Sequence, residues 1–137
     1  MAKQITISVL VDKPVAQVWK CWTTAADIEQ WNAASDDWHC PKALNDLRVD
    51  GRFSYTMAAR DGSASFDFEG TYTTVEPGAR IAYTMDDGRQ CAISFVAEGD
   101  GTRVTEVFDA ENMHSEEQQQ AGWQAILERF KQYAESR

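Results

Sequence analysis

The chain has 137 residues, of which 43% are hydrophobic and 26% charged, and its formal net charge is −9. This length and composition predict one globular domain, spanning residues 1–137, and exclude a disordered chain. Phosphate backbones and anionic lipid surfaces attract clustered Lys and Arg. Because this acidic chain has no two consecutive basic residues, neither a nucleic-acid nor a membrane partner is expected.

The N-terminus and the cysteines favour a cytoplasmic protein. The first residues lack the continuous apolar segment of a signal peptide, and no apolar stretch approaches the ~20 residues that span a bilayer. The chain has three cysteines, Cys21, Cys40 and Cys91, and no CxxC motif. An odd number of cysteines without such a motif is typical of proteins whose thiols stay reduced. The chain has only two histidines, His39 and His114, that could join the cysteines as metal ligands. We therefore expect no metal and no other cofactor.

The first part of the chain predicts one strand and two helices. Residues 5–11 are mostly β-branched and begin by alternating, as in a strand. Pro14 suits a first helical position, and residues at the spacing of one helix face follow: Val15, Val18, Trp19 and Trp22. A second short helix is predicted over residues 27–31. Residues 32–41 show no period and predict a loop.

From residue 42 onward, turn dipeptides separate six predicted strands. Four of the dipeptides are Asp-Gly and one is Pro-Gly, and Asp-Gly suits the positive φ of tight hairpin turns. The dipeptides occupy residues 50–51, 61–62, 77–78, 87–88 and 100–101. The strands lie at about residues 43–49, 52–58, 65–75, 79–85, 90–98 and 102–108. Strands joined by such short turns are antiparallel, so this segment predicts a meander.

Apolar and polar residues alternate along these strands, which predicts one buried face that another element must cover. A capping box at Ser115 and Gln118 begins the covering element, a helix of about 20 residues and ~30 Å. Its apolar stripe contains Trp123, Ile126, Leu127, Phe130 and Ala134. The sequence therefore predicts an α+β domain with a long C-terminal helix across a curved antiparallel sheet of about seven strands.

This order of elements resembles the helix-grip fold of START domains, the birch-pollen allergen family and polyketide cyclases. Local sequence is similar to the activator-of-heat-shock-ATPase-like branch of the SRPBCC superfamily, and the similarity covers essentially the whole chain. The residues that carry it are 14–19, Trp31, 49–53, 61–62, 70–72 and Pro77. One departure is Asp50-Gly51, where many relatives have Gly-Gly.

The resemblance implies a small-molecule cavity rather than the activity in the branch's name. The eukaryotic co-chaperone that supplies the name has an additional N-terminal domain that stimulates the chaperone ATPase, and this chain has no room for it. Stand-alone members are similar to hydrophobic-ligand binders. The residues expected to bind a ligand are Trp38, His39, Phe53, Tyr55, Met57, Phe66, Phe68, Tyr72, Tyr83, Phe95, Glu106, Phe108, Trp123 and Leu127.

Glu106 and His39 are the candidate acid–base residues. Glu106 shares a strand face with Val104 and Phe108, so if these point inward the carboxyl is buried and must find a partner or become protonated. A one-residue slip would instead turn it to solvent. His39 lies in the predicted loop, either at a cavity mouth or as an ordinary loop residue.

Three functions remain open from the sequence. The first is binding of a small hydrophobic or aromatic molecule between helix and sheet. The second is a cyclase- or isomerase-like enzyme, favoured if Glu106 and His39 line one cavity. The third is a chaperone-associated interaction domain, favoured by an exposed apolar patch. The oligomeric state stays open between a monomer and a homodimer.

Overall fold

A computed structural model describes residues 3–137; Met1 and Ala2, the first residues of the predicted domain, lie outside the described residues. The described chain forms seven strands and three helices in the predicted α+β order. They are β1 (Gln4–Val11), α1 (Val15–Thr23), α2 (Ala25–Trp31), β2 (Trp38–Asn45), β3 (Arg52–Ala59), β4 (Ser65–Glu76), β5 (Arg80–Met85), β6 (Gln90–Glu98), β7 (Gly101–Asp109) and α3 (Glu116–Glu135).

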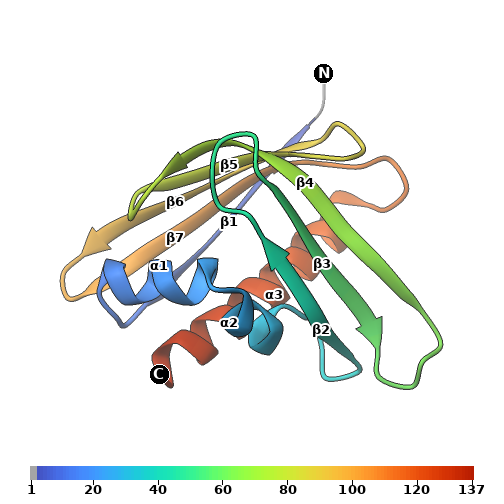
Figure 1. The fold of residues 1–137 in the computed structure, drawn as a ribbon, viewed down its shortest axis with the longest axis horizontal. Coiled ribbons are helices and arrows are strands. Elements are labelled where there is room, and N and C mark those ends of the chain that lie inside the picture. The colour runs from blue at the N-terminus through green and yellow to red at the C-terminus, as the bar shows by residue number, and fades with distance from the viewer. Residues whose placement is uncertain (1–2) are drawn as a thin grey trace.

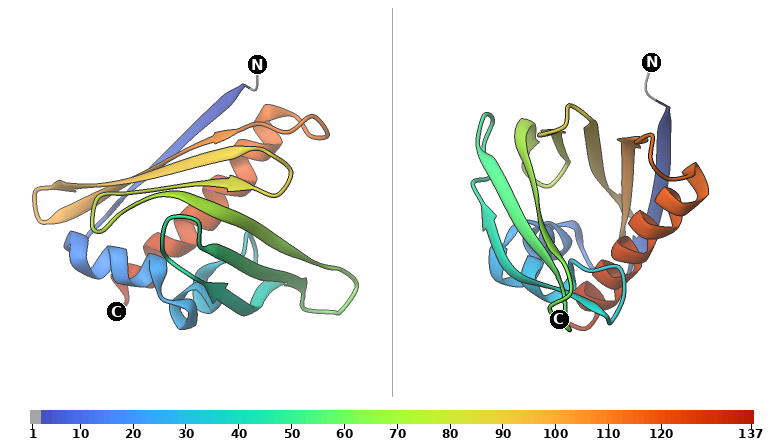
Figure 2. Two further views of the ribbon diagram at one scale, coloured as in Figure 1. Left: turned by 45° about the horizontal axis from the view of Figure 1, so that its top comes forward. Right: turned by 90° about the vertical axis from the view of Figure 1, so that its right-hand side faces the viewer.

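The strands form one antiparallel sheet in the order β1-β7-β6-β5-β4-β3-β2, which confirms the predicted meander. β1 adds to the far edge by pairing with β7, so that Ile7 lies opposite Glu106 and Val9 opposite Val104. The sheet curls into a half-barrel (Figure 2). Burial alternates strictly along β1, as expected for a strand with one face on the core.

The helices lie on the concave face of this sheet (Figure 1). α3 packs along β1 at one edge, α2 packs on β2 at the other edge, and α1 contacts β6 and β7. Helices therefore cover the edges of the half-barrel more closely than they cover β3, β4 and β5. This arrangement leaves space between the middle of the sheet and the helices.

α3 begins with the predicted capping box. The Ser115 side chain accepts a hydrogen bond from the Gln118 backbone N–H at 3.1 Å, and the Gln118 side chain accepts from the Ser115 N–H at 3.2 Å. Further along, Phe130 is fully buried and contacts the rings of Trp22 and Trp31, with centroids 4.7 and 4.9 Å away. These edge-on aromatic contacts join all three helices in one core.

The predicted boundaries of the first sheet-edge strand were wrong. The prediction placed a loop at residues 32–41 and a strand at 43–49, whereas β2 runs from Trp38 to Asn45. The register shifts between His39 and Lys42, where Pro41 has no N–H to donate. This irregularity at an edge strand removes the alternation from which a strand is predicted. Pro14 likewise lies one residue outside its predicted place, as the N-cap of α1.

Four of the five predicted turns lie wholly between strands, and the first and the last turn differ in detail. Asp50, not Gly51, has a positive φ of 70°. A Cβ on Gly51 would lie 2.1 Å from the Asp46 carbonyl oxygen, so this glycine is required by close backbone approach. At the last turn the positive φ of 60° belongs to Gly99, and Gly101 is already the first residue of β7.

Candidate functional site

A cavity of about 260 Å³ lies between the middle of the sheet and the helices. Eight of its fifteen lining residues are aromatic, and they come from the sheet and all three helices. The lining residues are Trp22, Trp31, Asn32, Tyr55, Met57, Phe66, Phe68, Tyr72, Ile81, Tyr83, Arg89, Ile93, Glu106, Trp123 and Ile126. Apolar walls with a few polar groups are typical of small-molecule sites.

Period-two alternation builds the sheet wall of the cavity. Tyr55 and Met57 on β3 point to the same face as Phe68 and Tyr72 on β4, and Tyr83 continues this face on β5. On the opposite side, the i, i+3 spacing of Trp123 and Ile126 on α3 turns both side chains toward the sheet. The wall therefore follows from the two periods of the sequence.

A hydrogen-bonded chain occupies one part of the wall. The Tyr72 hydroxyl donates to the Asn45 side-chain oxygen, and the Tyr55 and Tyr72 hydroxyls lie 3.3 Å apart. Burial raises the pKa of Tyr72 to about 12, so this hydroxyl keeps its proton at neutral pH. These two hydroxyls are bonded within the protein instead of reaching water.

Glu106 is the acidic residue of the cavity wall. Its side chain points inward, which is one of the two directions that the sequence left open, and the residue is only 5% exposed. Burial raises the pKa of the Glu106 carboxyl from 4.5 to about 8, and no charge or hydrogen bond within residues 3–137 offsets this effect. The carboxyl is therefore largely protonated at neutral pH and keeps unused hydrogen-bonding capacity toward the cavity.

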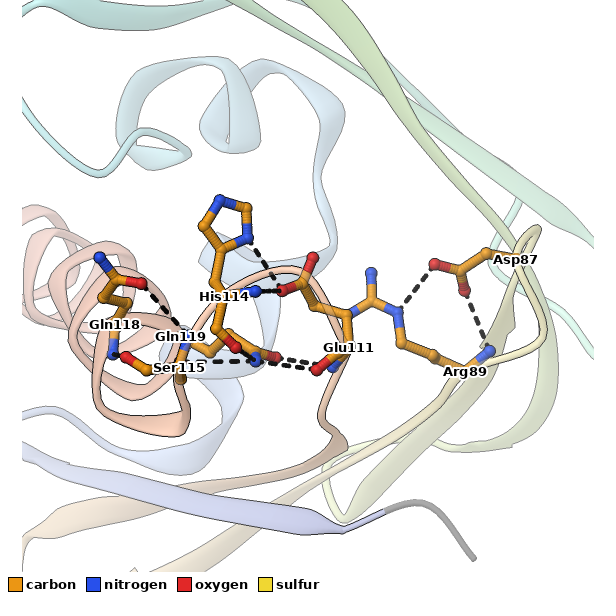
Figure 3. Close-up of polar contacts among 7 residues, drawn as sticks. All are labelled: Asp87, Arg89, Glu111, His114, Ser115, Gln118 and Gln119. Atoms are coloured by element: carbon orange, nitrogen blue, oxygen red, sulfur yellow. Dashed lines mark hydrogen bonds and ion pairs between the residues drawn. The ribbon is translucent and has the colours of Figure 1, made fainter.

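Arg89 lies where the cavity meets a polar groove on the surface. Asp87 holds Arg89 in place by accepting from its Nε at 2.8 Å and from its backbone N–H at 3.0 Å (Figure 3). Nearby, Glu111 accepts from the His114 backbone N–H, and Gln119 donates to the carbonyls of both residues. These contacts order the loop between β7 and α3 beside the groove.

Four of the residues predicted to bind a ligand are packed behind the cavity lining instead. Phe53 lies beneath the tyrosines of the sheet wall, 4.7 Å from the Tyr83 ring centroid. Phe95 packs against Trp19 and Trp22 of α1, and Phe108 stacks on Trp123 at 3.8 Å. Leu127 is fully buried in the core under α3. All four are buried in the core, and none of them lines the cavity.

Trp38 and His39 also lie outside the cavity lining. Both belong to the edge strand β2, and Trp38 reaches only the outer part of the site, with its ring centroid 6.0 Å from that of Phe66. Glu106 and His39 therefore do not line one cavity, which is the arrangement that would favour the enzyme hypothesis. Among residues 3–137, no group of three or more His, Cys, Asp or Glu side chains is placed to hold a metal.

Sequence reasoning missed seven lining residues: Trp22, Trp31, Asn32, Ile81, Arg89, Ile93 and Ile126. Ile81 and Ile93 belong to the same alternation as Tyr83, and Ile126 belongs to the stripe of α3, so a signal for these three was present. No local pattern distinguishes Trp22 and Trp31 from core residues of α1 and α2. Arg89 follows a turn, and only the tertiary structure places it at the cavity.

The fold and the cavity together define a helix-grip protein with an aromatic-lined internal site. Residues 12–135 match the family model described as Activator of Hsp90 ATPase homolog 1-like protein, and the chain belongs to this family. No curated protein matches. In the described range 3–137, no helix is both long and apolar enough to cross a bilayer.

Solved structures of similar proteins agree with this assignment. The AHSA1-like protein of Aeromonas hydrophila is 48% identical, with a TM-score of 0.93 over 98% of this chain and 93% of that one. A protein of Cytophaga hutchinsonii is also 48% identical, with a TM-score of 0.84 over 97% and 92% of the two chains. A Chromobacterium violaceum protein shares the fold at 23% identity, with a TM-score of 0.87 over 97% and 98%.

Proposed function

We propose that this protein binds a small hydrophobic or aromatic molecule in the cavity between α3 and the sheet. The observation that carries the proposal is an internal cavity of about 260 Å³ with eight aromatic side chains in its wall. A fully packed interior would have favoured the interaction hypothesis instead. Burial of an apolar ligand against these rings removes apolar surface from water, which is favourable at roughly 25 cal/mol per Å².

The size of the cavity limits the ligand. A dry apolar cavity of roughly 150 Å³ holds one benzene molecule, and the volume here is about 260 Å³. The proposed ligand is therefore a substituted single ring or a compact bicyclic molecule. A long acyl chain would have to extend past Phe66, which is 55% exposed at the rim of the cavity.

A cavity-filling variant tests the proposal. Ile93 on β6 lines the cavity, so Ile93→Trp should occupy the ligand's volume and weaken binding of a fluorescent apolar probe by tenfold or more. Val96 lies on the same strand but is 54% exposed on the outer face, which makes Val96→Trp the matched control. Equal probe affinity in the two variants, both folded by circular dichroism, would contradict the proposal.

Glu106 favours a second candidate function, a proton-transfer enzyme. A buried carboxyl whose pKa is raised to about 8 is suited to general acid–base chemistry near neutral pH. Such a carboxylate would take a proton from the carbon beside a ligand carbonyl, and solvent would return one.

In D₂O, this exchange replaces hydrogen with deuterium in a small aromatic ketone, and NMR detects it. Glu106→Gln should abolish the exchange while leaving ketone affinity within about twofold; no exchange above the buffer rate would exclude this candidate.

A further inference from the structure

We propose that the cavity selects small hydrophobic amines, whose ammonium group pairs with the Glu106 carboxylate while the apolar body contacts the aromatic wall. This inference rests on the proposed function and names the chemical class of the ligand. It begins from a polar group that the protein leaves without a partner. Glu106 is 5% exposed, lines the cavity, and has no charge or hydrogen bond from residues 3–137 to compensate its burial.

The residues directly opposite Glu106 on its two neighbouring strands are apolar. Its cross-strand partners are Ile7 on β1 and Ile93 on β6, and neither can donate a hydrogen bond to it. A buried carboxylate needs a compensating group, and because none of the described residues offsets the burial of Glu106, the ligand is placed to supply one. A charged donor forms hydrogen bonds roughly twice as strong as a neutral one, so an ammonium group compensates the carboxylate better than a hydroxyl does.

The aromatic wall also favours a cation. The faces of Trp, Tyr and Phe rings carry negative charge density and attract ammonium groups within about 6 Å. Trp31, Tyr83 and Trp123 reach the cavity from α2, β5 and α3, so rings surround the cavity on several sides. An anionic ligand would gain nothing from these faces and would be repelled by an ionised Glu106.

The groove beside the cavity has the matching charge. The groove that shares Arg89 with the cavity contains two basic residues, Lys3 and Arg89, against four acidic residues, Asp87, Asp109, Glu111 and Glu116, which gives a formal charge of −2. Arg89 itself is held by Asp87 (Figure 3). The whole chain carries −9, and a field of this sign raises the local concentration of cations.

The release of a proton on binding would identify an amine bound to Glu106. Because the Glu106 carboxyl of the free protein has a pKa of about 8, an amine that binds as its ammonium form expels close to one proton at pH 7. The titratable neighbours of Glu106 are Tyr83 on β5 and Cys91 on β6, and burial keeps the pKa of both well above neutral. β1 and α3 contribute Ile7, Trp123 and Ile126, which do not titrate. Glu106 is therefore the source of the proton.

The test compares 2-phenylethylamine with its neutral isostere 2-phenylethanol and with the anion phenylacetate. Isothermal titration calorimetry at pH 8 should show the amine binding at least tenfold more tightly than the alcohol, and phenylacetate more weakly than either. At pH 7, titrations in phosphate and in Tris should give close to one proton released per bound amine and none for the alcohol.

Glu106→Gln should remove both the amine preference and the proton release. Glu128→Gln, which removes the same charge from the exposed face of α3, should leave all three affinities unchanged. If the alcohol binds but the amine has no advantage, or if the variant keeps that advantage, the amine inference fails and the binding function stands. If no probe binds the unaltered protein at millimolar concentration, both fail.

Discussion

The Glu106 carboxyl makes the stability of the folded chain depend on pH. Burial raises its pKa from 4.5 to about 8, so between these values the folded chain keeps a proton that the unfolded chain has lost. The contribution of Glu106 to stability is then fully present below the unfolded pKa, and this contribution to the free energy of unfolding falls as pH rises through the window. For one group, the free energy of unfolding falls by about 1.4 kcal/mol per pH unit, and this decrease stops once the pH exceeds the folded pKa.

Glu106→Gln removes this pH dependence, because the amide has no proton to lose. The free energy of unfolding of the variant, relative to the unaltered chain, should therefore increase by about 1.4 kcal/mol for each unit from about pH 5 to about pH 8. Urea melts at four pH values give the measurement. Glu128→Gln is the control on the solvent-exposed face of α3. Parallel stability curves for Glu106→Gln and the unaltered chain would show that the carboxyl titrates normally.

Gly70 is required where β4 passes over a core ring. A Cβ at this position would lie 2.7 Å from the Phe53 ring and 2.7 Å from the Thr84 carbonyl oxygen. Phe53 is packed on all sides, so Gly70→Ala should reduce the free energy of unfolding by about 1–3 kcal/mol, as overpacking does. Gly122→Ala is the matched control, since a Cβ there meets nothing within 4 Å and alanine favours the helix. A denaturant melt in which both variants gain stability would contradict the argument.

At the scale of elements, α3 is held by its buried stripe. Phe130 is fully buried against Trp22 and Trp31, and truncation of such an aromatic side chain costs about 3–5 kcal/mol. Phe130→Ala should show this loss in urea melts. Trp123 is only partly buried and borders the cavity, so Trp123→Ala should lose less. The reverse order would mean that α3 is anchored mainly at its N-terminal half.

The beginning of α3 is stabilised by local hydrogen bonds. Because the Ser115 side chain satisfies the Gln118 N–H, Ser115→Ala should reduce the free energy of unfolding by about 1 kcal/mol. Ser115→Asp keeps an acceptor and adds a charge that favours a helix N-terminus, so it should restore the loss. Thermal melts of the three proteins provide the measurement. If Ala and Asp are equivalent, the capping box contributes nothing measurable.

At the scale of the whole molecule, sheet and helices should unfold together. Phe95 on β6 contacts Trp19 and Trp22 of α1, and Phe108 on β7 stacks on Trp123 of α3, so one core includes every layer. Small single-core domains unfold in one cooperative transition. Tryptophan fluorescence and far-ultraviolet circular dichroism should therefore give the same midpoint in urea. An earlier fluorescence transition would mean that the helices detach from an intact sheet.

The inward direction of Glu106 was left open by the sequence, which alone determined the order of elements, the residues that share a strand face and the turns of the meander. Each depends on neighbours in the chain: alternation of period two sets the strand face, Ser115 and Gln118 begin α3, and Asp-Gly pairs form hairpin turns. Where local information was irregular, prediction failed. Pro41 and the register shift after His39 interrupt the alternation of β2, so its boundaries were misplaced.

Only the tertiary structure decided which inward residues line the cavity and which fill the core. Phe53 and Tyr55 are both apolar residues on one face of β3, yet Tyr55 borders the cavity and Phe53 is packed behind it. The difference depends on the curl of the sheet and on where α2 and α3 cross it, which are contacts between distant parts of the chain. A sequence period specifies a face but not the distance from that face to the covering helix, and that distance determines whether a side chain meets another side chain or a cavity.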